Sequence, residues 1–256
     1  MKHTVVFSIH DTAGIIFDLV EQITPTLQEI FSRAVVSITP KTEETQERRV
    51  EKMGRDGFFE LCKNEPGTMV GDHYMKAVRT ALERSEEDEV IHVCTPDRLA
   101  LAIVKHKNEF LKDMEEERKE ERPILYERSD FAWSTHPINY RAIESMAANL
   151  GKILFGKELD FFWCDLAVRA GLLKTAAEKV KSSDFTVLAE LILPLKDELI
   201  VKKVDWLEWE DPFIFAKEPE GFKKEREASE EENRKRLGYV VATIEWLLAA
   251  QKDSGV

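Results

Sequence analysis

Short apolar runs rich in β-branched residues alternate with helical patterns along the first part of this chain. Candidate strands cover residues 4–9, 34–38, 58–62 and 89–94, and polar loops and helical patterns separate them. Strands separated by helices pair through crossover connections, which give parallel strands with helices on both faces. The alternation therefore predicts an α/β fold, with a mostly parallel sheet sandwiched by helices.

The second half of the chain continues this pattern less regularly. Residues 99–122 follow helical spacing and predict one long helix, which Pro123 ends. Alternation over residues 161–173 predicts a strand that carries Asp165 and Arg169 on one face. No repeat or low-complexity linker divides the chain, so a single domain (1–256) with a C-terminal helical elaboration is expected. The other predicted elements are strands at 124–128 and 199–204 and helices at 15–31, 43–53, 75–82, 143–155, 174–181, 185–195 and 237–250.

The net charge of the chain argues against a nucleic-acid partner. Its 37 Lys and Arg stand against 49 Asp and Glu, for a formal net charge of −12. Nucleic-acid-binding proteins gain affinity by neutralising phosphates with clustered Lys and Arg, and this sequence contains no such basic stripe. We therefore expect no nucleic-acid partner.

The cysteines and the apolar runs indicate in which cellular compartment the protein is found. Cys62, Cys94 and Cys164 are odd in number, widely spaced and set in apolar runs, as is typical of buried thiols in a reducing compartment. The first apolar run is too short for a signal peptide, and no run reaches the roughly 18 residues that a membrane span requires. The sequence thus predicts a cytoplasmic protein without a transmembrane segment.

Polar loops follow the predicted strands of the first half. The first loop contains His10 and Asp11, the second contains Thr39 and Lys41, and the fourth contains Asp97. Parallel strands end at the same edge of a sheet, and open α/β sheets bind their ligands at that edge. These loops therefore predict a ligand site along one rim of the sheet.

A glycine-containing loop between the third strand and the next helix belongs to the same rim. It contains Gly67, Gly71 and Asp72, and the helix that follows carries Lys76. Such a loop can wrap a diphosphate, or its glycines can simply allow positive φ angles; the sequence leaves both interpretations open. The two commonest phosphate-binding motifs, Gly-x-x-x-x-Gly-Lys-Ser/Thr and Gly-x-Gly-x-x-Gly after the first strand, do not occur.

Three segments, taken in their order and spacing, resemble GT-A nucleotide-diphosphosugar transferases, and within them a little-characterised prokaryotic branch. They are residues 8–11 (Ser-Ile-His-Asp), 92–98 (His-Val-Cys-Thr-Pro-Asp-Arg) and 135–137 (Thr-His-Pro). In GT-A enzymes the fourth strand ends in Asp-x-Asp, whose carboxylates hold a divalent metal on the diphosphate. Here Thr95 occupies the first acidic position, so Asp97 is the remaining carboxylate of that motif.

The resemblance implies transfer of a sugar from a nucleotide-diphosphosugar to an unknown acceptor. It implies that residues 1–130 bind the nucleotide and residues 131–256 bind the acceptor. It also implies that Asp97 and His136 hold Mg²⁺ or Mn²⁺; of these two residues, Asp97 offers the oxygen ligand that such hard cations prefer. The remaining implied roles are catalysis by Asp184 and Asp165 and nucleotide binding by Ser8, His10, Asp11, Thr39, Lys41, Gly67, Gly71, Asp72, Lys76 and Arg98.

Each of these roles has a structural alternative, and so does the function. Asp11 and Asp184 are also typical helix caps, and Thr-His-Pro around His136 can start a helix. A non-catalytic nucleotide or sugar-nucleotide binding protein is a second hypothesis, since Thr95 replaces a metal ligand. A third is an interaction protein that forms a homo-oligomer through the aromatic segment 206–215, although such aromatic residues are often core residues.

Overall fold

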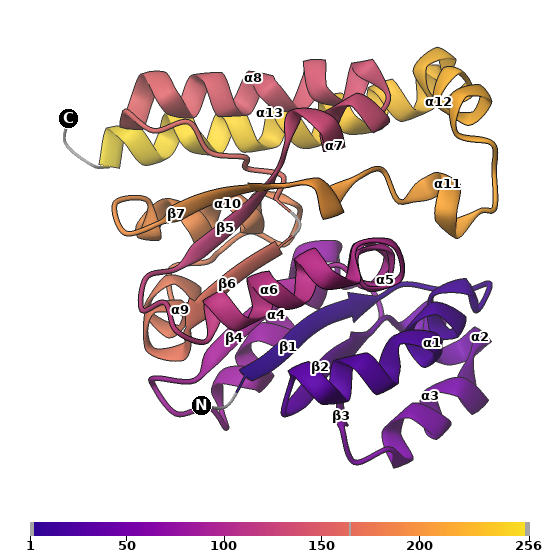
Figure 1. Ribbon diagram of the computed structural model, residues 1–256. Coiled ribbons are helices and arrows are strands. Elements are labelled where there is room, and N and C mark those ends of the chain that lie inside the picture. The colour runs from indigo at the N-terminus through magenta and orange to yellow at the C-terminus, as the bar shows by residue number, and fades with distance from the viewer. Residues whose placement is uncertain (1–2, 164, 254–256) are drawn as a thin grey trace.

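The computed structural model describes residues 3–163 and 165–253, and one seven-stranded sheet runs through its centre (Figure 1). Its strands are β1 (His3–Ile9), β2 (Arg33–Ile38), β3 (Phe59–Lys63), β4 (Val90–Cys94), β5 (Ile124–Arg128), β6 (Asp165–Arg169) and β7 (Ile200–Val204). The strand order is β3-β2-β1-β4-β6-β5-β7. Strand β6 runs antiparallel to β4 and β5, whereas the other pairings are parallel. The predicted mostly parallel α/β sheet is confirmed.

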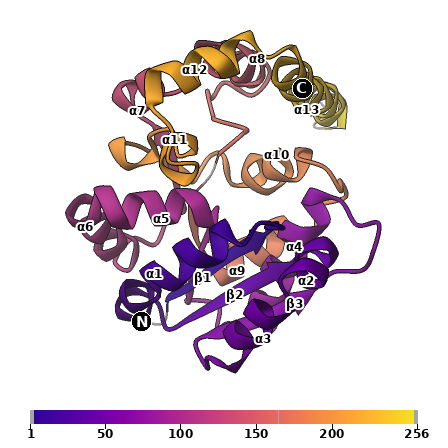
Figure 2. The same cartoon turned by 90° about the vertical axis from the view of Figure 1, so that its right-hand side faces the viewer.

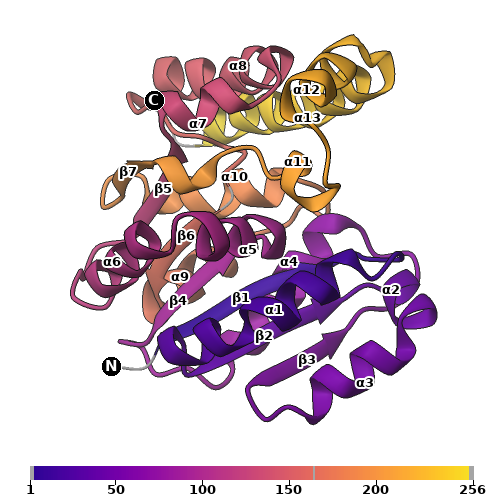
Figure 3. The same ribbon diagram turned by 45° about the vertical axis from the view of Figure 1, so that its right-hand side comes forward.

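The order of the strands creates a switch point between β1 and β4 (Figure 3). From β1 the chain moves outward to β2 and β3, and then returns to add β4 on the other side of β1. The pairings Ser8 with Ser37 and Ile9 with Ile38 bring the carboxyl ends of β1 and β2 level. Crevices at such switch points are where open α/β sheets bind ligands.

Two layers of helices cover the sheet (Figure 2). Apolar residues of α1, α3, α5 and α6 pack on one face, and those of α4, α8, α9, α10 and α13 pack on the other. The helices of the first layer are α1 (Ile15–Ile30), α3 (Glu47–Arg55), α5 (Pro96–Lys105) and α6 (Lys107–Glu117), and those of the second are α4 (Val70–Leu82), α8 (Ile138–Phe155), α9 (Ala170–Ala177), α10 (Thr186–Ile192) and α13 (Glu230–Asp253). The shorter helices are α2 (Pro40–Thr45), α7 (Asp130–Thr135), α11 (Asp211–Ile214) and α12 (Pro219–Ala228), with 3-10 turns η1 (Leu193–Leu195) and η2 (Asp205–Leu207).

The C-terminal elaboration consists of long helices beside the sheet. Helices α8 and α13 lie side by side, away from β1 to β3 (Figure 1). Both halves of the chain contribute strands to the one sheet, because β6 and β7 come from the second half. In the part of the chain that the structure describes, no helix combines the length and apolarity needed to cross a membrane.

Several predicted boundaries differ from the structure. The predicted helix over residues 99–122 is divided into α5 and α6, because His106 leaves helical geometry at φ −121° and ψ 29°. Of the strand predicted over 161–173, β6 takes residues 165–169, and α9 begins at Ala170. Between β5 and α8, the short helix α7 adds an element that was not among those predicted, and the Ser129 hydroxyl caps its first turn.

Helix α1 contains Pro25, a residue type that usually bends or breaks a helix. The helix continues through this proline, which lies on its solvent-exposed side. A proline removes one hydrogen bond of the helix, and on the exposed side water can bind the carbonyl left without a partner. The buried face, with Phe17, Val20, Ile23 and Leu27, holds both ends of α1 on the sheet.

The two tryptophans of the aromatic segment 206–215 belong to the core. Trp206 has no exposed surface, and its indole N–H donates to Asp113 Oδ2 at 2.8 Å. Trp209 is 4% exposed and its ring stacks on Phe222 at 5.3 Å between centroids. These two tryptophans are therefore core residues, whereas Phe215 of the same segment is 45% exposed.

We predict that Gly71→Ala destabilises the fold. The added Cβ would lie 2.4 Å from the Asp184 carbonyl oxygen and 2.6 Å from the Ser183 carbonyl carbon. Backbone atoms cannot swing aside as a side chain can, so we expect a loss of about 1–3 kcal/mol in urea unfolding. Gly57→Ala is the matched control, since no atom lies within 4 Å of its added Cβ. Equal unfolding midpoints for the two variants would contradict the close approach at Gly71.

Candidate functional site

The carboxyl ends of β1 and β2 meet as predicted. His10 is exposed, and its Nδ1 lies 3.1 Å from the Thr39 hydroxyl. Asp11 is 5% exposed, and its carboxylate accepts hydrogen bonds from the backbone N–H groups of Gly14, Ile15 and Phe17. Asp11 therefore caps the start of α1, which is the structural alternative, whereas His10 stays available to a ligand.

The other residues predicted at this end of the sheet also include both helix caps and groups that a ligand can reach. Thr39 is buried and caps α2, with its hydroxyl accepting from the Thr42 backbone N–H. Lys41 is exposed and pairs with Glu44 at 3.3 Å. Ser8 is half-buried within β1. Lys41 therefore adds an exposed cation to the rim, while the Thr39 hydroxyl is committed to local contacts.

The glycine loop lies against the start of α10. Gly67 has a φ of +87°, and the Gly71 N–H donates to the Ser183 carbonyl at 2.8 Å. Asp72 accepts from the Met69 N–H and so caps α4, while Asp184 accepts from the Thr186 N–H at 2.8 Å. Segments more than 110 positions apart in the sequence thus meet here, and both acidic side chains have capping contacts.

Two exposed or half-exposed basic groups stand near this loop on α4. Lys76 is exposed, and His73 Nε2 lies 2.9 Å from the Thr68 hydroxyl. Burial lowers the pKa of His73, and the nearby His10 lowers it further, against the opposite effect of Asp72. His10 and His73 are therefore close enough to interact electrostatically, which places α4 beside the end of β1.

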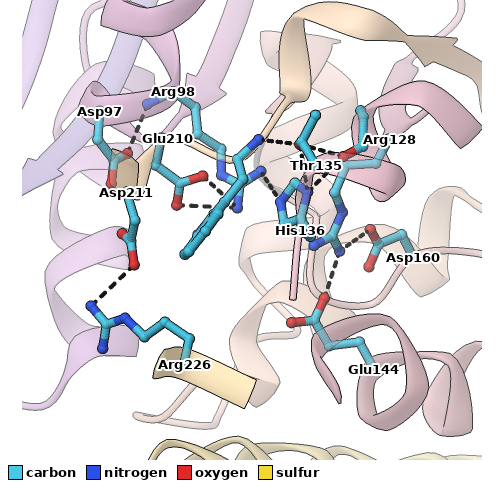
Figure 4. Close-up of polar contacts among 12 residues, drawn as sticks. Asp97, Arg98, Arg128, Thr135, His136, Glu144, Asp160, Glu210, Asp211 and Arg226 are labelled. Carbon is cyan, nitrogen blue, oxygen red and sulfur yellow. Dashed lines mark hydrogen bonds and ion pairs between the residues drawn. The ribbon is translucent and has the colours of Figure 1, made fainter. Parts of the chain in front are cut away.

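At the carboxyl end of β4, a second group of polar residues forms around Arg98 (Figure 4). Its guanidinium lies 3.1 Å from Glu210 Oε2 and 3.5 Å from His136 Nε2. Asp97 lies one residue earlier in the first turn of α5, and Asp211 follows Glu210. We call Asp97, Arg98, His136, Glu210 and Asp211 the Arg98 cluster.

His136 in this cluster is a neutral imidazole. Its side chain is 1% exposed, and its Nδ1 lies 2.8 Å from the Ala132 carbonyl, which requires the proton on Nδ1. Burial lowers the pKa of His136 well below its usual value, and Arg98 and Arg128 lower it further. Its Nε2 lone pair faces Arg98, so the prediction that His136 binds a metal loses its support: the ring orients Arg98 instead.

The carboxylates of the Arg98 cluster interact with one another. Burial raises the pKa of Glu210 to about 7; Arg98 opposes this shift, and the charges of Asp97 and Asp211 reinforce it. Burial also raises the pKa of Asp211, against the effect of Arg226, whose guanidinium lies 3.1 Å from Asp211 Oδ2. A carboxyl with a pKa near neutrality is suited to exchange protons with a substrate.

A neighbouring group of residues anchors the C-terminal helices to this region (Figure 4). The Arg128 guanidinium pairs with Glu144 at 2.6 Å and with Asp160 at 2.7 Å, and it lies 3.6 Å from the centre of the Trp133 ring. Arg236 of α13 pairs with the other oxygen of Glu144 at 2.6 Å. These contacts join β5, α7, α8 and α13 and fix the position of His136.

Asp165 cannot be a catalytic residue that contacts an acceptor, because it has no exposed surface. Its Oδ1 lies 3.1 Å from His92 Nε2, beneath α5 and α6. The opposite nitrogen, His92 Nδ1, lies 3.0 Å from Glu117 Oε1, and Glu117 Oε2 lies 2.9 Å from His3 Nε2. We call His3, His92, Cys94, Glu117 and Asp165 the His92 cluster.

Charge is retained inside this buried cluster. Burial alone would raise the pKa of Glu117, but His92 and the hydrogen bonds from His3 and His92 outweigh it and lower the pKa to about 2. Burial would likewise lower the pKa of His92, but Glu117 and Asp165 raise it well above its usual value. His92 and Glu117 therefore form an ion pair in the interior.

The surroundings of Asp97 fit only a metal site whose other ligands come from the substrate and water. Within residues 3–163 and 165–253, the groups of three potential ligand side chains that approach one another within 4.8 Å lie in the His92 cluster, and Asp97 belongs to none of them. Mg²⁺ binds through one or two carboxylates when substrate phosphates and water complete its shell. Asp97 therefore suits a metal that arrives with a diphosphate, and does not suit a permanent protein-ligated ion.

Comparison with known proteins gives neighbours in fold only. No protein-family model matches the chain, and no curated protein matches it. Glucosyl-3-phosphoglycerate synthase from Mycobacterium tuberculosis, solved with Mn²⁺, UDP and phosphoglyceric acid, covers 79% of this chain and 68% of its own at 12% identity and a TM-score of 0.49. The match to a 4-diphosphocytidyl-2C-methyl-D-erythritol synthase from Anaerococcus prevotii DSM 20548 covers 87% of this chain and 98% of the synthase chain. Its identity is 11% and its TM-score is 0.47.

At 11–12% identity and TM-scores below 0.5, the likeness assigns no substrate and no activity to this chain.

Sequence analysis missed the partners that complete the Arg98 cluster. Glu210 and Asp211 lie within the segment 206–215, which was noted only for its aromatic residues. Glu117 of the His92 cluster lies in the predicted helix over residues 99–122, where it was not singled out. Glu117 is in fact 2% exposed. Helical spacing offered one signal, since Glu117 follows Phe110 by seven positions and Met114 by three, on the buried face of α6.

We predict that Glu210→Gln changes how stability depends on pH. Because the folded-state pKa is raised from 4.5 to about 7, protonation of Glu210 stabilises the fold at low pH, and this contribution is lost as pH rises between these values. Relative to the wild type, the variant should therefore gain roughly 1–3 kcal/mol across this interval in urea unfolding. The exposed Glu65→Gln serves as the control, and parallel curves for Glu210→Gln and wild type would refute a raised pKa.

Proposed function

We propose that this protein is a glycosyltransferase that moves a sugar from a nucleotide-diphosphosugar to an acceptor. The observation that carries the proposal is the switch point between β1 and β4. The motif residues His10 and Asp97 follow these two strands, and ligands of open α/β sheets bind where the strand order reverses. The resemblance of segments 8–11, 92–98 and 135–137 to GT-A transferases supports the same site.

The nucleotide would lie across the ends of β1 and β2. His10, Lys41 and Lys76 are exposed there, in a chain whose overall charge is strongly negative. Cations and the N-termini of helices attract phosphate groups, and α4 and α5 both begin at this edge. We assign the nucleoside to the His10 side and the diphosphate to the side of Lys76 and Asp97.

Asp97 would hold Mg²⁺ or Mn²⁺ on the diphosphate. A divalent ion there would offset the negative charge that develops on the departing nucleotide. Arg98 is held by Glu210 and His136, so it contributes a fixed positive charge behind Asp97. Arg98 does not replace the carboxylate that Thr95 lacks at the first acidic position of the motif, but its positive charge would help to neutralise the diphosphate.

The acceptor would bind on the side formed by residues 131–256. Asp184 is half-exposed beside Gly71, and its carboxylate is the remaining predicted catalytic group that a substrate can reach. Glu210, with its pKa of about 7, is a second carboxyl suited to remove a proton from an acceptor hydroxyl. We propose that one of these two carboxylates is the general base.

A thermal-shift screen tests the donor site. The purified chain is heated with UDP, GDP, CDP and dTDP and their sugar conjugates, each with and without Mn²⁺. A ligand that binds only the folded state stabilises it by about 2.7 kcal/mol at a hundred times its dissociation constant. A shift with one nucleotide that requires Mn²⁺ is the expected result, and it would name the donor class.

We predict that Asp97→Asn weakens the Mn²⁺-dependent part of this shift. Loss of one charged contact costs about 1.5–3 kcal/mol, which raises the Kd roughly tenfold or more. Asp88→Asn is the matched control, because Asp88 is exposed and precedes the amino end of the same strand. Equal metal-dependent shifts in both variants would contradict the role of Asp97, and a metal-independent shift would favour the non-catalytic binding protein.

A further inference from the structure

The His92 cluster has a side on which the donor atoms are only partly used. His92 and Cys94 are two residues apart on β4 and therefore point to the same face of the sheet. Asp165 is paired with Cys94 across the antiparallel β4–β6 ladder. As a result His92 Nε2, Cys94 Sγ and an Asp165 carboxylate oxygen all lie within 4.8 Å of one another, and all three residues have no exposed surface.

Both sides of the His92 ring include a buried polar atom without a hydrogen-bond partner, which on the Nδ1 side is His3 Nδ1. On the Nδ1 side, Glu117 places one oxygen 3.0 Å from His92 and the other 2.9 Å from His3. On the Nε2 side, Asp165 Oδ1 lies 3.1 Å from His92, while Asp165 Oδ2 is buried without a hydrogen-bond partner. A buried carboxylate oxygen without a partner costs free energy, so a ligand for it is expected.

We propose that His92 Nε2, Cys94 Sγ and the Asp165 carboxylate bind a zinc ion in the interior of the protein. Imidazole, thiolate and carboxylate are the three ligand types that Zn²⁺ takes in proteins. Zinc binding would release the proton of His92 Nε2 and that of the Cys94 thiol, so the His92–Glu117 ion pair would become a neutral His92 whose Nδ1–H donates to Glu117. Mg²⁺ and Mn²⁺, the ions expected at Asp97, prefer oxygen ligands, so the Cys94 sulfur separates the two sites chemically. The free Oδ2 of Asp165 offers a fourth donor atom.

The Nδ1 side then has a defined role. A histidine that binds a metal through one nitrogen commonly donates the other N–H to a carboxylate, which fixes the ring and raises its basicity. Glu117 is placed for this role at His92 Nδ1. Phe31, Phe110 and Tyr126 surround the His92 ring at 5.8 to 6.4 Å between centroids, so the ion would be shielded from water.

The site would be structural, and it goes beyond the proposed transfer reaction. Its ligands come from β4 and β6, the strands at which the parallel part of the sheet meets the antiparallel part. Metal binding would therefore stabilise the joint between the two parts of the sheet, because binding free energy at such a site is also folding free energy. Neither a nucleotide nor an acceptor is needed to test it.

The first experiment measures metal in the full chain, purified with any affinity tag removed. Elemental analysis after incubation with ZnCl₂ and dialysis should find about one zinc ion per chain. Chelator-treated protein given Co²⁺ should then develop the near-ultraviolet charge-transfer band of a cobalt–thiolate bond. Absence of bound zinc together with absence of this band, in protein with intact near-ultraviolet circular dichroism, would overturn the proposal.

Two cysteine variants locate the site. We predict that Cys94→Ala lowers bound zinc to near zero and removes the cobalt band, whereas Cys62→Ala leaves both unchanged. Cys62 is the matched control because it is also buried on a strand, where its thiol faces the Val36 carbonyl. Removing zinc with a chelator should lower the Tm of the wild type and of Cys62→Ala only. Equal zinc content in the two variants would overturn the assignment to Cys94.

Glu117→Gln tests the positioning role of Glu117. The amide can still accept the His92 N–H but carries no charge, so zinc affinity should fall by about 10–100-fold while the cobalt band remains. Loss of the band in a variant that keeps its near-ultraviolet circular dichroism would show instead that Glu117 is itself a ligand, as in the alternative group His3, His92 and Glu117. That result would overturn the proposed ligand set.

Discussion

The antiparallel pairing of β6 with β4 and β5 is the constraint on which the rest of the structure depends. It inserts a strand from the second half of the chain between two strands of the first half, so that neither half has a complete sheet alone. The β4–β6 register sets Asp165 opposite Cys94 and brings it to His92. A shift of this register by one residue would turn Asp165 to the other face and leave His92 with one carboxylate partner.

A buried charge network at this joint makes the register specific. An interior ion pair adds little net stability, because the loss of hydration offsets the attraction between the charges. A wrong arrangement is costly, however, because it leaves His92 or Glu117 charged and unpaired in an apolar region. The network therefore selects one arrangement of β1, β4, β6 and α6, and the same selectivity brings metal-ligating atoms together.

Many of the polar residues at the rim of the sheet are helix caps. Asp11, Thr39 and Asp72 satisfy the free N–H groups at helix starts, which any helix requires whether or not a ligand binds. Once these residues are set aside, His10 and Asp97 remain beside the switch point, with Arg98 fixed behind by partners from later in the chain. The candidate site is thus smaller than the set of polar residues at the strand ends.

The sequence by itself determined the alternation of strands and helices, the buried faces and the edge of the sheet at which polar loops gather, because these follow from periodicities of two and about 3.6 residues. It did not determine the break of the long helix at His106, the burial of Asp165 or the partners of Arg98. Glu210 and His136 reach Arg98 across 112 and 38 positions. Such contacts depend on strand order and helix docking, and only the tertiary structure decides these, since the same local patterns fit more than one arrangement of the elements.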